Sequence, residues 1–425
     1  MKKGIAAICG TGILTCVCWA LSSPQTPVGV TGQVSQLIGG LALTGFAMMF
    51  FTATRARVLD QFFSGLDKAY VVHKWLGVVS VCLVVLHFAT HGGVNPRGIG
   101  SGRGSGFGQG RGLELGHGLG PWGVASMLLF AALVLIALFA VKLKYEVWKL
   151  VHMLMAIAYT IGLIHYYGSS TYNPWGVNPF SLWLDLVNLV GVAAAVYTIF
   201  LYELLGFRHA YQITELRQVG QGNLEITAAT SSRPLSYRPG QFTFVKFPDV
   251  RFTSHPFTIA AAGNGQTLQF AIRALGDHTS KLGSTLKVGA RLVAAKAHGR
   301  FDYTSGTPRQ IWIAAGIGIT PFRAFIQAGV PEGFKVDFFY SYKSEQGAYL
   351  DELAAPINNV QVHLIDTATS PRLSAQQIVR ALEPNSRVDV YFCGPKIMRE
   401  ALRKDLKASE LNVVGFHFEE FTFGR

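Results

Sequence analysis

Four histidines lie inside long apolar stretches of the sequence, where an ionisable side chain is costly and usually has a function. His73 and His87 share one stretch, and His152 and His165 share another. Neutral imidazole is a common axial ligand of haem iron, and two histidines on facing helices can hold one haem between them. A helix of 14 residues rises by about 21 Å, so the pattern predicts two b-type haems stacked across a membrane.

The helical rotation between the histidines fits one pair better than the other. At about 100° per residue, His87 lies within about 40° of the helix face of His73. His165, however, is turned about 140° away from His152, and a tilted or locally distorted helix would have to absorb the difference. His91, one turn beyond His87, is a rival outer ligand. A purely structural interpretation would have the histidines pair with bundle neighbours, but two pairs at matched depth favour haem ligation.

Six apolar stretches are long enough, at about 20 residues, to cross the hydrocarbon core of a membrane as helices. They are residues 4–22, 34–54, 71–91, 123–141, 149–167 and 180–204. The first follows two lysines and also has the features of a cleavable signal peptide. The sequence therefore predicts a six-helix transmembrane domain over residues 1–205, with removal of the first helix as the alternative.

Positive charge is distributed unevenly around these six stretches. Lysines and arginines gather on one side, at Lys2, Lys3, Arg55, Arg57, Lys68, Lys142, Lys144, Lys149 and Arg208. The short loops 23–33 and 168–179 carry neither residue. Since such charges remain on the cytoplasmic side, we predict a multi-pass protein of the cell (inner) membrane with a cytoplasmic C-terminal half. The glycine-rich loop 92–122 has three arginines on the outer side. We expect it to be flexible, with a lid or a metal-binding loop using His117 as the alternatives.

The overall composition excludes several other classes of protein. Half of the 425 residues are apolar and 14% are charged, below the usual quarter. The net charge of +13 suits loops beside anionic lipid, and no module for nucleic-acid binding is recognisable. Four of the five cysteines lie in apolar stretches and none forms a C-x-x-C pair, so neither a disulfide framework nor a zinc site is expected.

The C-terminal half has the pattern of a soluble protein with two sections. Short β-type runs at 212–215, 224–227, 242–247, 257–260, 268–273 and 291–294 predict a small antiparallel β-barrel over 206–303. Strands at 310–314, 336–340, 360–364 and 388–392 alternate with helical runs. This alternation predicts an α/β domain with a parallel sheet over 304–425, which would bind a nucleotide at the carboxyl ends of its strands.

Two sequence motifs suggest which ligands these sections bind. His255-Pro256-Phe257-Thr258 offers an aromatic ring and a hydroxyl for a flavin, and Arg273 can neutralise a diphosphate. Gly316 and Gly318, in the run that ends with Thr320 and Pro321, allow the backbone to approach a diphosphate at a helix N-terminus. A bare G-x-G is explained equally well by a tight turn, but here it stands between a strand and a helix.

These residues resemble the ferric reductase and NADPH oxidase family, and the resemblance covers nearly the whole chain. That family joins a six-helix haem domain to a module similar to plant ferredoxin–NADP reductase. The two histidine pairs match its pairs in type and spacing, and Gly65-Leu66-Asp67-Lys68 and Tyr145-Glu146 are similar to its inner loops. The family generally keeps the first helix, which implies that 4–22 is retained.

The resemblance also implies roles for residues of the C-terminal half. The flavin motif and the glycine motif match, and so does Cys393-Gly394-Pro395 with Met398, a nicotinamide-nucleotide motif. Thr279 joins the cofactor-binding set by the same resemblance. An aromatic residue near the C-terminus covers the flavin in this module; Phe423 is the first choice and Phe421 the alternative.

The nucleotide preference depends on a departure from the family pattern. Relatives that select the 2′-phosphate of NADPH often carry Ser-Arg after the second strand of the nucleotide domain. This sequence has Ser341-Tyr342-Lys343, so Lys343 would have to replace the missing arginine. We expect NADPH to be preferred, with NADH as the alternative donor.

The implied function is electron transfer from cytosolic NAD(P)H through FAD and two b-type haems to an acceptor outside. Hydride would reach the flavin between Cys393 and Phe423, and electrons would pass the inner haem (His73, His152) and then the outer one (His87, His165). Oxygen, giving superoxide, is the expected acceptor because it needs no shaped polar site. The alternatives are reduction of ferric iron or another metal, and supply of electrons to a docked redox protein. No obligatory protein partner is evident in the sequence.

Overall fold

The protein is described by a computed structural model. It describes residues 2–24, 29–90, 120–139, 143, 145–170, 172, 176–249, 251–274, 279–383 and 385–419. The chain divides into two compact units, with the change of unit between Glu203 and Leu204. The finer domain boundaries expected at 205 and 303 stay predictions.

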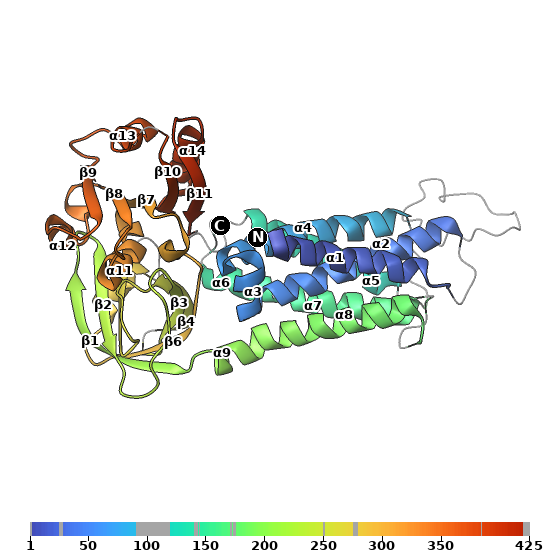
Figure 1. Ribbon diagram of the computed structural model, residues 1–425. Coiled ribbons are helices and arrows are strands. Elements are labelled where there is room, and N and C mark those ends of the chain that lie inside the picture. Colours follow the sequence, from blue (N-terminus) through green and yellow to red (C-terminus); the bar gives the residue numbers. More distant parts are fainter. Residues whose placement is uncertain are drawn as a thin grey trace, which may run out of the picture. The chain divides into compact units, whose positions relative to one another are not determined.

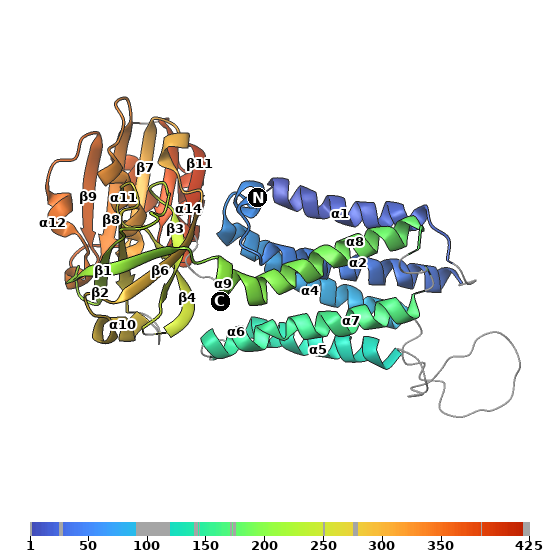
Figure 2. The ribbon, with the colours of Figure 1, turned by 90° about the horizontal axis from the view of Figure 1, so that it is seen from below.

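In the described part of the first unit, the regular secondary structure is helical (Figure 1, Figure 2). Its elements are α1 (Lys2–Ala20), α2 (Val30–Thr52), α3 (Arg57–Phe63), α4 (Leu66–Thr90), α5 (Gly120–Phe139), α6 (Tyr145–Met153), α7 (Met155–Ser169), α8 (Pro179–Val196), the π-helical turn η1 (Tyr197–Leu201) and α9 (Tyr202–Leu205). Among the described residues, six helical segments are long and apolar enough to cross a membrane: Lys2–Ala20, Val30–Thr52, Leu66–Thr90, Gly120–Phe139, Val147–Ser169 and Pro179–Leu205. The predicted six-helix bundle is confirmed.

Apolar side chains occupy both the inside and the outside of this bundle. Inside, the rings of Phe46 and Phe130 stack with centroids 3.9 Å apart. Outside, large apolar residues stay exposed, including Phe139 at 73% and Leu189 at 65%. Water would disfavour so much exposed apolar surface, whereas lipid does not. The protein is therefore an integral membrane protein whose outer helix faces contact lipid.

The fifth membrane segment is interrupted by a tightened turn. Helix α6 ends at Met153 and α7 begins at Met155. At the junction, the Leu154 N–H donates to the Val151 carbonyl at 3.1 Å, and the Ile157 N–H donates to the Leu154 carbonyl at 3.0 Å. Such i to i+3 bonds wind the chain more tightly than an α-helix does. The segment therefore rotates by more than an ideal helix of the same length.

The second unit begins with a six-stranded antiparallel sheet in the order β4-β3-β6-β1-β2-β5. Its strands are β1 (His209–Gln218), β2 (Asn223–Ala229), β3 (Phe242–Phe247), β4 (Arg251–Thr258), β5 (Thr267–Arg273) and β6 (Arg291–His298), with helix α10 (Thr279–Thr285) between β5 and β6. A core of buried apolar side chains, including Ile226, Phe270 and Leu292, fills this part. The predicted antiparallel fold is confirmed, and closure of the sheet into a barrel stays a prediction.

A five-stranded parallel sheet follows, in the order β11-β10-β7-β8-β9. Its elements are β7 (Arg309–Ala315), α11 (Thr320–Ala328), β8 (Lys335–Tyr342), α12 (Leu350–Ala354), β9 (Val360–Asp366), α13 (Ala375–Arg380), β10 (Arg387–Cys393), α14 (Lys396–Lys407) and β11 (Asn412–Phe418), with short 3₁₀ turns at Tyr303–Ser305, Gly316–Ile319 and Ser344–Gln346. The predicted α/β fold is confirmed. The strand order reverses between β7 and β10, and nucleotides bind beside such a switch point.

Candidate functional site

The four intramembrane histidines form two pairs. The ring centroids of His73 and His152 lie 5.9 Å apart, and those of His87 and His165 lie 6.4 Å apart. A metal–imidazole bond is about 2 Å long, so two imidazoles on one metal ion have centroids about 6 Å apart. Both separations therefore fit one iron atom between the rings.

Hydrogen bonds fix the protonated nitrogen of two of these rings. His73 Nδ1 lies 2.9 Å from the Met49 carbonyl, and His87 Nδ1 lies 2.7 Å from the Ser35 carbonyl. A carbonyl oxygen only accepts, so Nδ1 donates in each neutral ring and Nε2 keeps its lone pair. A metal-binding histidine needs this arrangement.

The two other histidines have different surroundings. His165 Nδ1 lies 3.4 Å from the Ser169 hydroxyl. His152 stacks on Trp148, with centroids 4.9 Å apart, and its buried Nδ1 has no hydrogen-bond partner among the described residues. No group of three or more His, Cys, Asp or Glu side chains suited to a metal ion occurs in the described part of the chain. Pairs alone fit haem, whose macrocycle supplies the other iron ligands.

The tightened turn at Leu154 reduces the rotational mismatch between the two histidines that lie 13 residues apart. A 3₁₀ turn advances about 120° per residue instead of about 100°. Each such residue removes about 20° of the 140° mismatch expected between His152 and His165, so the single turn at Leu154 relieves part of it. The sequence could show the mismatch but not the place where the helix relieves it.

Two glycines beside the outer histidines were not recognised from the sequence. A Cβ added at Gly39 would lie 3.1 Å from His87 Nδ1, and one at Gly123 would lie 2.9 Å from the His165 ring. Both positions therefore leave room for an imidazole ring next to the helix backbone. Glycine inside an apolar helix was a usable signal, because it weakens the helix without an evident local reason.

Four predicted residues cannot be placed. His91, His117, Phe421 and Phe423 lie outside the described residues. The choice between His91 and His87, and the choice of Phe423 or Phe421 to cover the flavin, therefore stay predictions.

The candidate flavin motif lies on β4, an edge strand that pairs with β3. Thr258 is 5% exposed, and its hydroxyl has no hydrogen-bond partner among the described residues. Because a buried unpaired hydroxyl is costly, this group is suited to bind the polar edge of a ligand. His255, Pro256 and Phe257 are half-buried beside it, and the Phe257 ring lies 6.4 Å from that of Phe270.

Arg273 lies where the antiparallel sheet meets the parallel one. Its Nη2 donates to the Gln346 side chain at 2.7 Å. A Cβ added at Gly316 would lie 3.3 Å from its Nη1. The guanidinium therefore borders the glycine loop from the end of β5. Thr279 begins α10, just after four residues outside the described set.

The glycine loop follows β7 and leads into α11. Gly316 has a φ of 55°, in the left-handed region that glycine adopts most easily. A Cβ at Gly318 would overlap the carbonyl group of Cys393, so only glycine fits there. The Thr320 hydroxyl donates to the Ile317 carbonyl at 3.2 Å, and Pro321 occupies the first turn of α11. The loop N–H groups and the helix N-terminus can receive a diphosphate.

Cys393 ends β10 at the switch point and is completely buried. Burial raises the pKa of its thiol well above the ordinary value, and the nearby Glu419 carboxylate raises it further. At neutral pH Cys393 is therefore a thiol and not a thiolate. Gly394 and Pro395 follow, and Pro395 precedes α14.

Glu419 is a candidate functional residue that the sequence analysis missed. It is 8% exposed and acts electrostatically on Cys393. A Cβ at Gly299 would lie 3.1 Å from its Oε1. Its only sequence signal was its position shortly before the aromatic residues expected to cover the flavin.

The candidate residues for the 2′-phosphate lie at the end of β8. Ser341 is buried, whereas Lys343 is exposed and stands just before the 3₁₀ turn Ser344–Gln346. An exposed ammonium group here is free to move toward an anionic ligand.

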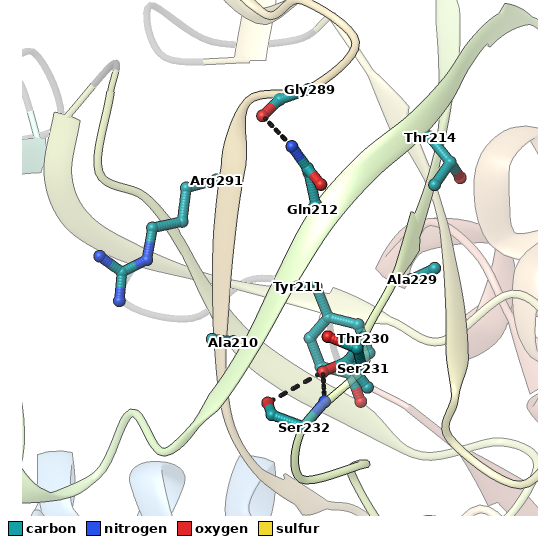
Figure 3. Close-up of a pocket in the computed structure, with 10 residues that line it drawn as sticks. All are labelled: Ala210, Tyr211, Gln212, Thr214, Ala229, Thr230, Ser231, Ser232, Gly289 and Arg291. Carbon is teal, nitrogen blue, oxygen red and sulfur yellow. Dashed lines mark hydrogen bonds between the residues drawn. The ribbon is translucent and has the colours of Figure 1, made fainter.

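A surface pocket of about 570 Å³ lies elsewhere in the second unit (Figure 3). Its lining comes from β1, the end of β2 with the residues that follow, and the start of β6: Ala210, Tyr211, Gln212, Thr214, Ala229, Thr230, Ser231, Ser232, Gly289 and Arg291. None of the residues predicted to bind a cofactor lines it. We therefore assign it no part in the candidate site.

Three family profiles match successive parts of the chain. They are "Ferric reductase like transmembrane component" at residues 38–163, "FAD-binding domain" at 208–307 and "Oxidoreductase NAD-binding domain" at 312–404. The chain therefore combines a ferric reductase-like membrane component with an FAD-binding and an NAD-binding domain.

Individual relatives match parts of the same arrangement. NADPH oxidase 1 of Rattus norvegicus is 26% identical over 243 residues, covering 43% of this chain and 43% of its own. "Putative respiratory burst oxidase homolog protein H" of Arabidopsis thaliana is 29% identical over 148 residues, covering 34% of this chain and 16% of its own. These matches bear out the resemblance to ferric reductases and NADPH oxidases that the sequence motifs indicated.

Other relatives match the second unit. The carnitine monooxygenase reductase subunit of Escherichia coli (strain K12) is 28% identical over 204 residues, covering 45% of this chain and 62% of its own. Among solved structures, a ferredoxin reductase in carbazole 1,9a-dioxygenase aligns with a TM-score of 0.44 and 21% identity, over 50% of this chain and 69% of its own. The chain spans less than two thirds of the length of the first curated relatives it matches.

Proposed function

We propose that this protein carries electrons from NAD(P)H, through FAD and two b-type haems, to oxygen on the opposite side of the membrane, giving superoxide. The observation that supports this most strongly is the pair of histidine sites at two levels of one helical bundle. The same chain carries the FAD-binding and NAD-binding domains. One polypeptide therefore contains candidate sites for NAD(P)H, FAD and both haems.

In the second unit, the residues bind and align the two nucleotides. FAD, when bound, accepts a hydride from the nicotinamide and passes electrons on singly. The Thr258 hydroxyl is placed to bind the flavin edge, and Arg273 to neutralise a diphosphate. Gly316 and Gly318 leave the backbone bare for the second diphosphate. Cys393 stays a neutral thiol at the switch point, where it excludes water.

In the membrane unit, four histidines would hold the two haems. His73 and His152 would ligate the inner one, and His87 and His165 the outer one. The Met49 and Ser35 carbonyls accept hydrogen bonds from Nδ1 of His73 and His87, which puts the lone pair that would bind iron on Nε2 of each ring. Held by these histidines in apolar surroundings, haem would supply one-electron transfer, and the residues around it would set its potential.

The direction of transfer follows from the distribution of basic residues. Loops with Lys and Arg favour a cytoplasmic N-terminus and a cytoplasmic second unit. NAD(P)H would then be oxidised in the cytoplasm, and the outer haem would face outward. We place the protein in the cell (inner) membrane on this basis.

Oxygen is the proposed acceptor because it is small and enters lipid without a polar binding site. A ferric chelate is bulkier and charged, and the outer segment 168–179 carries no charged residue. Ferric reduction is the second candidate, favoured by the match of residues 38–163 to a ferric reductase-like component. Supply of electrons to a docked protein is the third.

Turnover in membranes distinguishes the acceptors. We expect membranes containing the protein to reduce cytochrome c with NADPH, and superoxide dismutase to suppress this reduction. Membranes without the protein are the control. Reduction that resists the dismutase, with faster anaerobic turnover on ferric citrate, would instead establish a metal reductase.

Lys343→Ala tests recognition of the 2′-phosphate. A charge-assisted hydrogen bond contributes about 1.5–3 kcal/mol, and less at an exposed position. We expect the KM for NADPH to rise about 3- to 10-fold and the KM for NADH to change little. Lys335→Ala, at the opposite end of β8, is the matched control. Equal changes in the KM for NADPH and the KM for NADH would show that Lys343 does not bind the 2′-phosphate.

A further inference from the structure

A buried ionic network joins the flavin domain (208–307) to the nucleotide domain (312–404). Its centre is Arg323 on α11, whose side chain is 8% exposed. The guanidinium donates to both Glu352 carboxylate oxygens, at 2.7 and 2.9 Å. It also donates to the Ala260 carbonyl at 3.1 Å and to the Gln269 side chain at 2.8 Å, both in the flavin domain. The Arg323 side chain therefore forms hydrogen bonds with residues of both domains.

Glu225, on β2 of the flavin domain, is the acidic partner at the same place. Its side chain is 2% exposed and lies 3.5 Å from Arg323 Nη1. It accepts hydrogen bonds from Arg217 at 2.8 and 3.1 Å, and from the Tyr349 hydroxyl at 2.6 Å. The Tyr349 ring also lies 4.2 Å from the Arg323 guanidinium. Each buried charge thus has partners in both domains.

The backbone at Tyr349 indicates that this contact is specified by the fold. Tyr349 has a φ of 58°, a left-handed conformation that a bulky residue rarely adopts. Such a conformation persists only where the surroundings fix it. Here the hydrogen bond to Glu225 and the contact with Arg323 hold the ring in place.

Three further hydrogen bonds cross between the domains beside this network. They join the Gln221 N–H to the Glu345 carbonyl at 2.6 Å, the Asn223 side chain to the Gln346 carbonyl at 2.9 Å, and Arg273 to the Gln346 side chain at 2.7 Å. The contact region is therefore polar and directional, and its geometry is better defined than that of an apolar contact of similar extent.

We propose that Arg323 and Glu225 are positioning residues for hydride transfer, holding the glycine loop of the nucleotide domain at a fixed place relative to the flavin sheet. Arg323 follows the loop 316–321 on the same short helix, so anchoring it anchors the loop. A displacement of about 1 Å between reacting groups can slow a reaction about 100-fold. This inference rests on the proposed function, because it assumes that NAD(P)H reduces the flavin.

The affinity for the nucleotide and the rate of hydride transfer should respond differently to a change here. Most of the nucleotide site lies within one domain, at the glycine loop and at Cys393–Pro395, so its affinity should depend little on the network. The distance from nicotinamide to flavin spans both domains, so the rate should depend on it strongly. A role in folding alone would produce no such difference.

The test uses the full-length protein, purified in detergent with FAD, and its Arg323→Lys and Glu225→Gln variants. Lysine keeps the charge but cannot reproduce the planar fork of donors. At saturating NADPH without oxygen, we expect flavin reduction to slow at least about 10-fold in both variants. The apparent Kd for NADPH should change less than about threefold, with FAD content retained. Glu400→Gln removes an exposed ion pair on α14, 3.8 Å long, and should change nothing.

A second measurement needs no bound cofactor. Amide hydrogen exchange of the flavin-free protein should accelerate in 345–354 in both variants, but not in Glu400→Gln. Unchanged flavin reduction, or slowing explained entirely by lost FAD, would overturn the proposal, and so would unchanged exchange. If NADPH fails to reduce the flavin of the unmodified protein, the proposed function fails instead.

Discussion

Replacing His73 by leucine should abolish electron transfer across the membrane and leave flavin reduction intact. Losing an outer partner of a metal ligand already costs about 10- to 100-fold, so losing the ligand should cost more than about 100-fold. The reduced-minus-oxidised b-type spectrum should fall to half, and the haem content should drop from two per chain to one. NAD(P)H-dependent reduction of a soluble dye by the second unit should continue.

A matched substitution separates haem loss from general damage to the bundle. His87→Leu should remove the other haem and the same transmembrane activity, because the two pairs occupy separate levels. Thr160→Ala is the control and should be mild, because this exposed hydroxyl donates to the Ala156 carbonyl of its own helix at 2.9 Å. A full haem complement in His73→Leu would exclude the assigned ligand.

Gly318→Ala should abolish hydride transfer while leaving haem and FAD in place. The added Cβ would overlap the Cys393 carbonyl and lie 3.1 Å from Cys393 Sγ, so β7 and β10 must separate at the nucleotide site. A shift of about 1 Å can slow transfer about 100-fold. Anaerobic flavin reduction by NADPH measures this directly, and dithionite should still reduce the flavin and both haems.

The control is a glycine-to-alanine change in open space. A Cβ at Gly283 on α10 would meet no atom within 4 Å, so Gly283→Ala should reduce its flavin at the ordinary rate. If Gly318→Ala behaved like Gly283→Ala, the glycine loop would not be the nucleotide site. If instead both lost their FAD, the defect would lie in folding.

The periodicity of the chain was enough to predict the six membrane helices and the order of the two sheets, but α3 and β11 were not expected. Apolar stretches of about 20 residues indicate membrane-spanning helices. Alternating strands and helices from 310 onward predicted a parallel sheet, since parallel strands need crossovers. The histidine pairs could be predicted for a related reason. The rise per residue of a helix gives the distance across the membrane between two histidines of known spacing.

The sequence could not predict contacts that depend on where separate elements meet. Arg323 reads as an ordinary helix residue, and Glu225 stands on a strand about 100 residues earlier along the chain. Nothing local indicates that they are buried together. The tightened turn at Leu154 was hidden for another reason, because no proline or glycine marks it. Glu419 became visible only once β11 brought it beside Cys393.

Helix α2 contacts both histidines of α4 in an antiparallel register. His73 donates to the Met49 carbonyl and His87 to the Ser35 carbonyl, so the two donors and the two acceptors are each separated by 14 positions. Insertion or deletion of one residue between Ser35 and Met49 would break one of these bonds and preserve the other. Related chains should therefore vary in loop length but keep the spacing of 14 positions in α2 and in α4. If one of the two spacings changes, the other should change by the same number of residues.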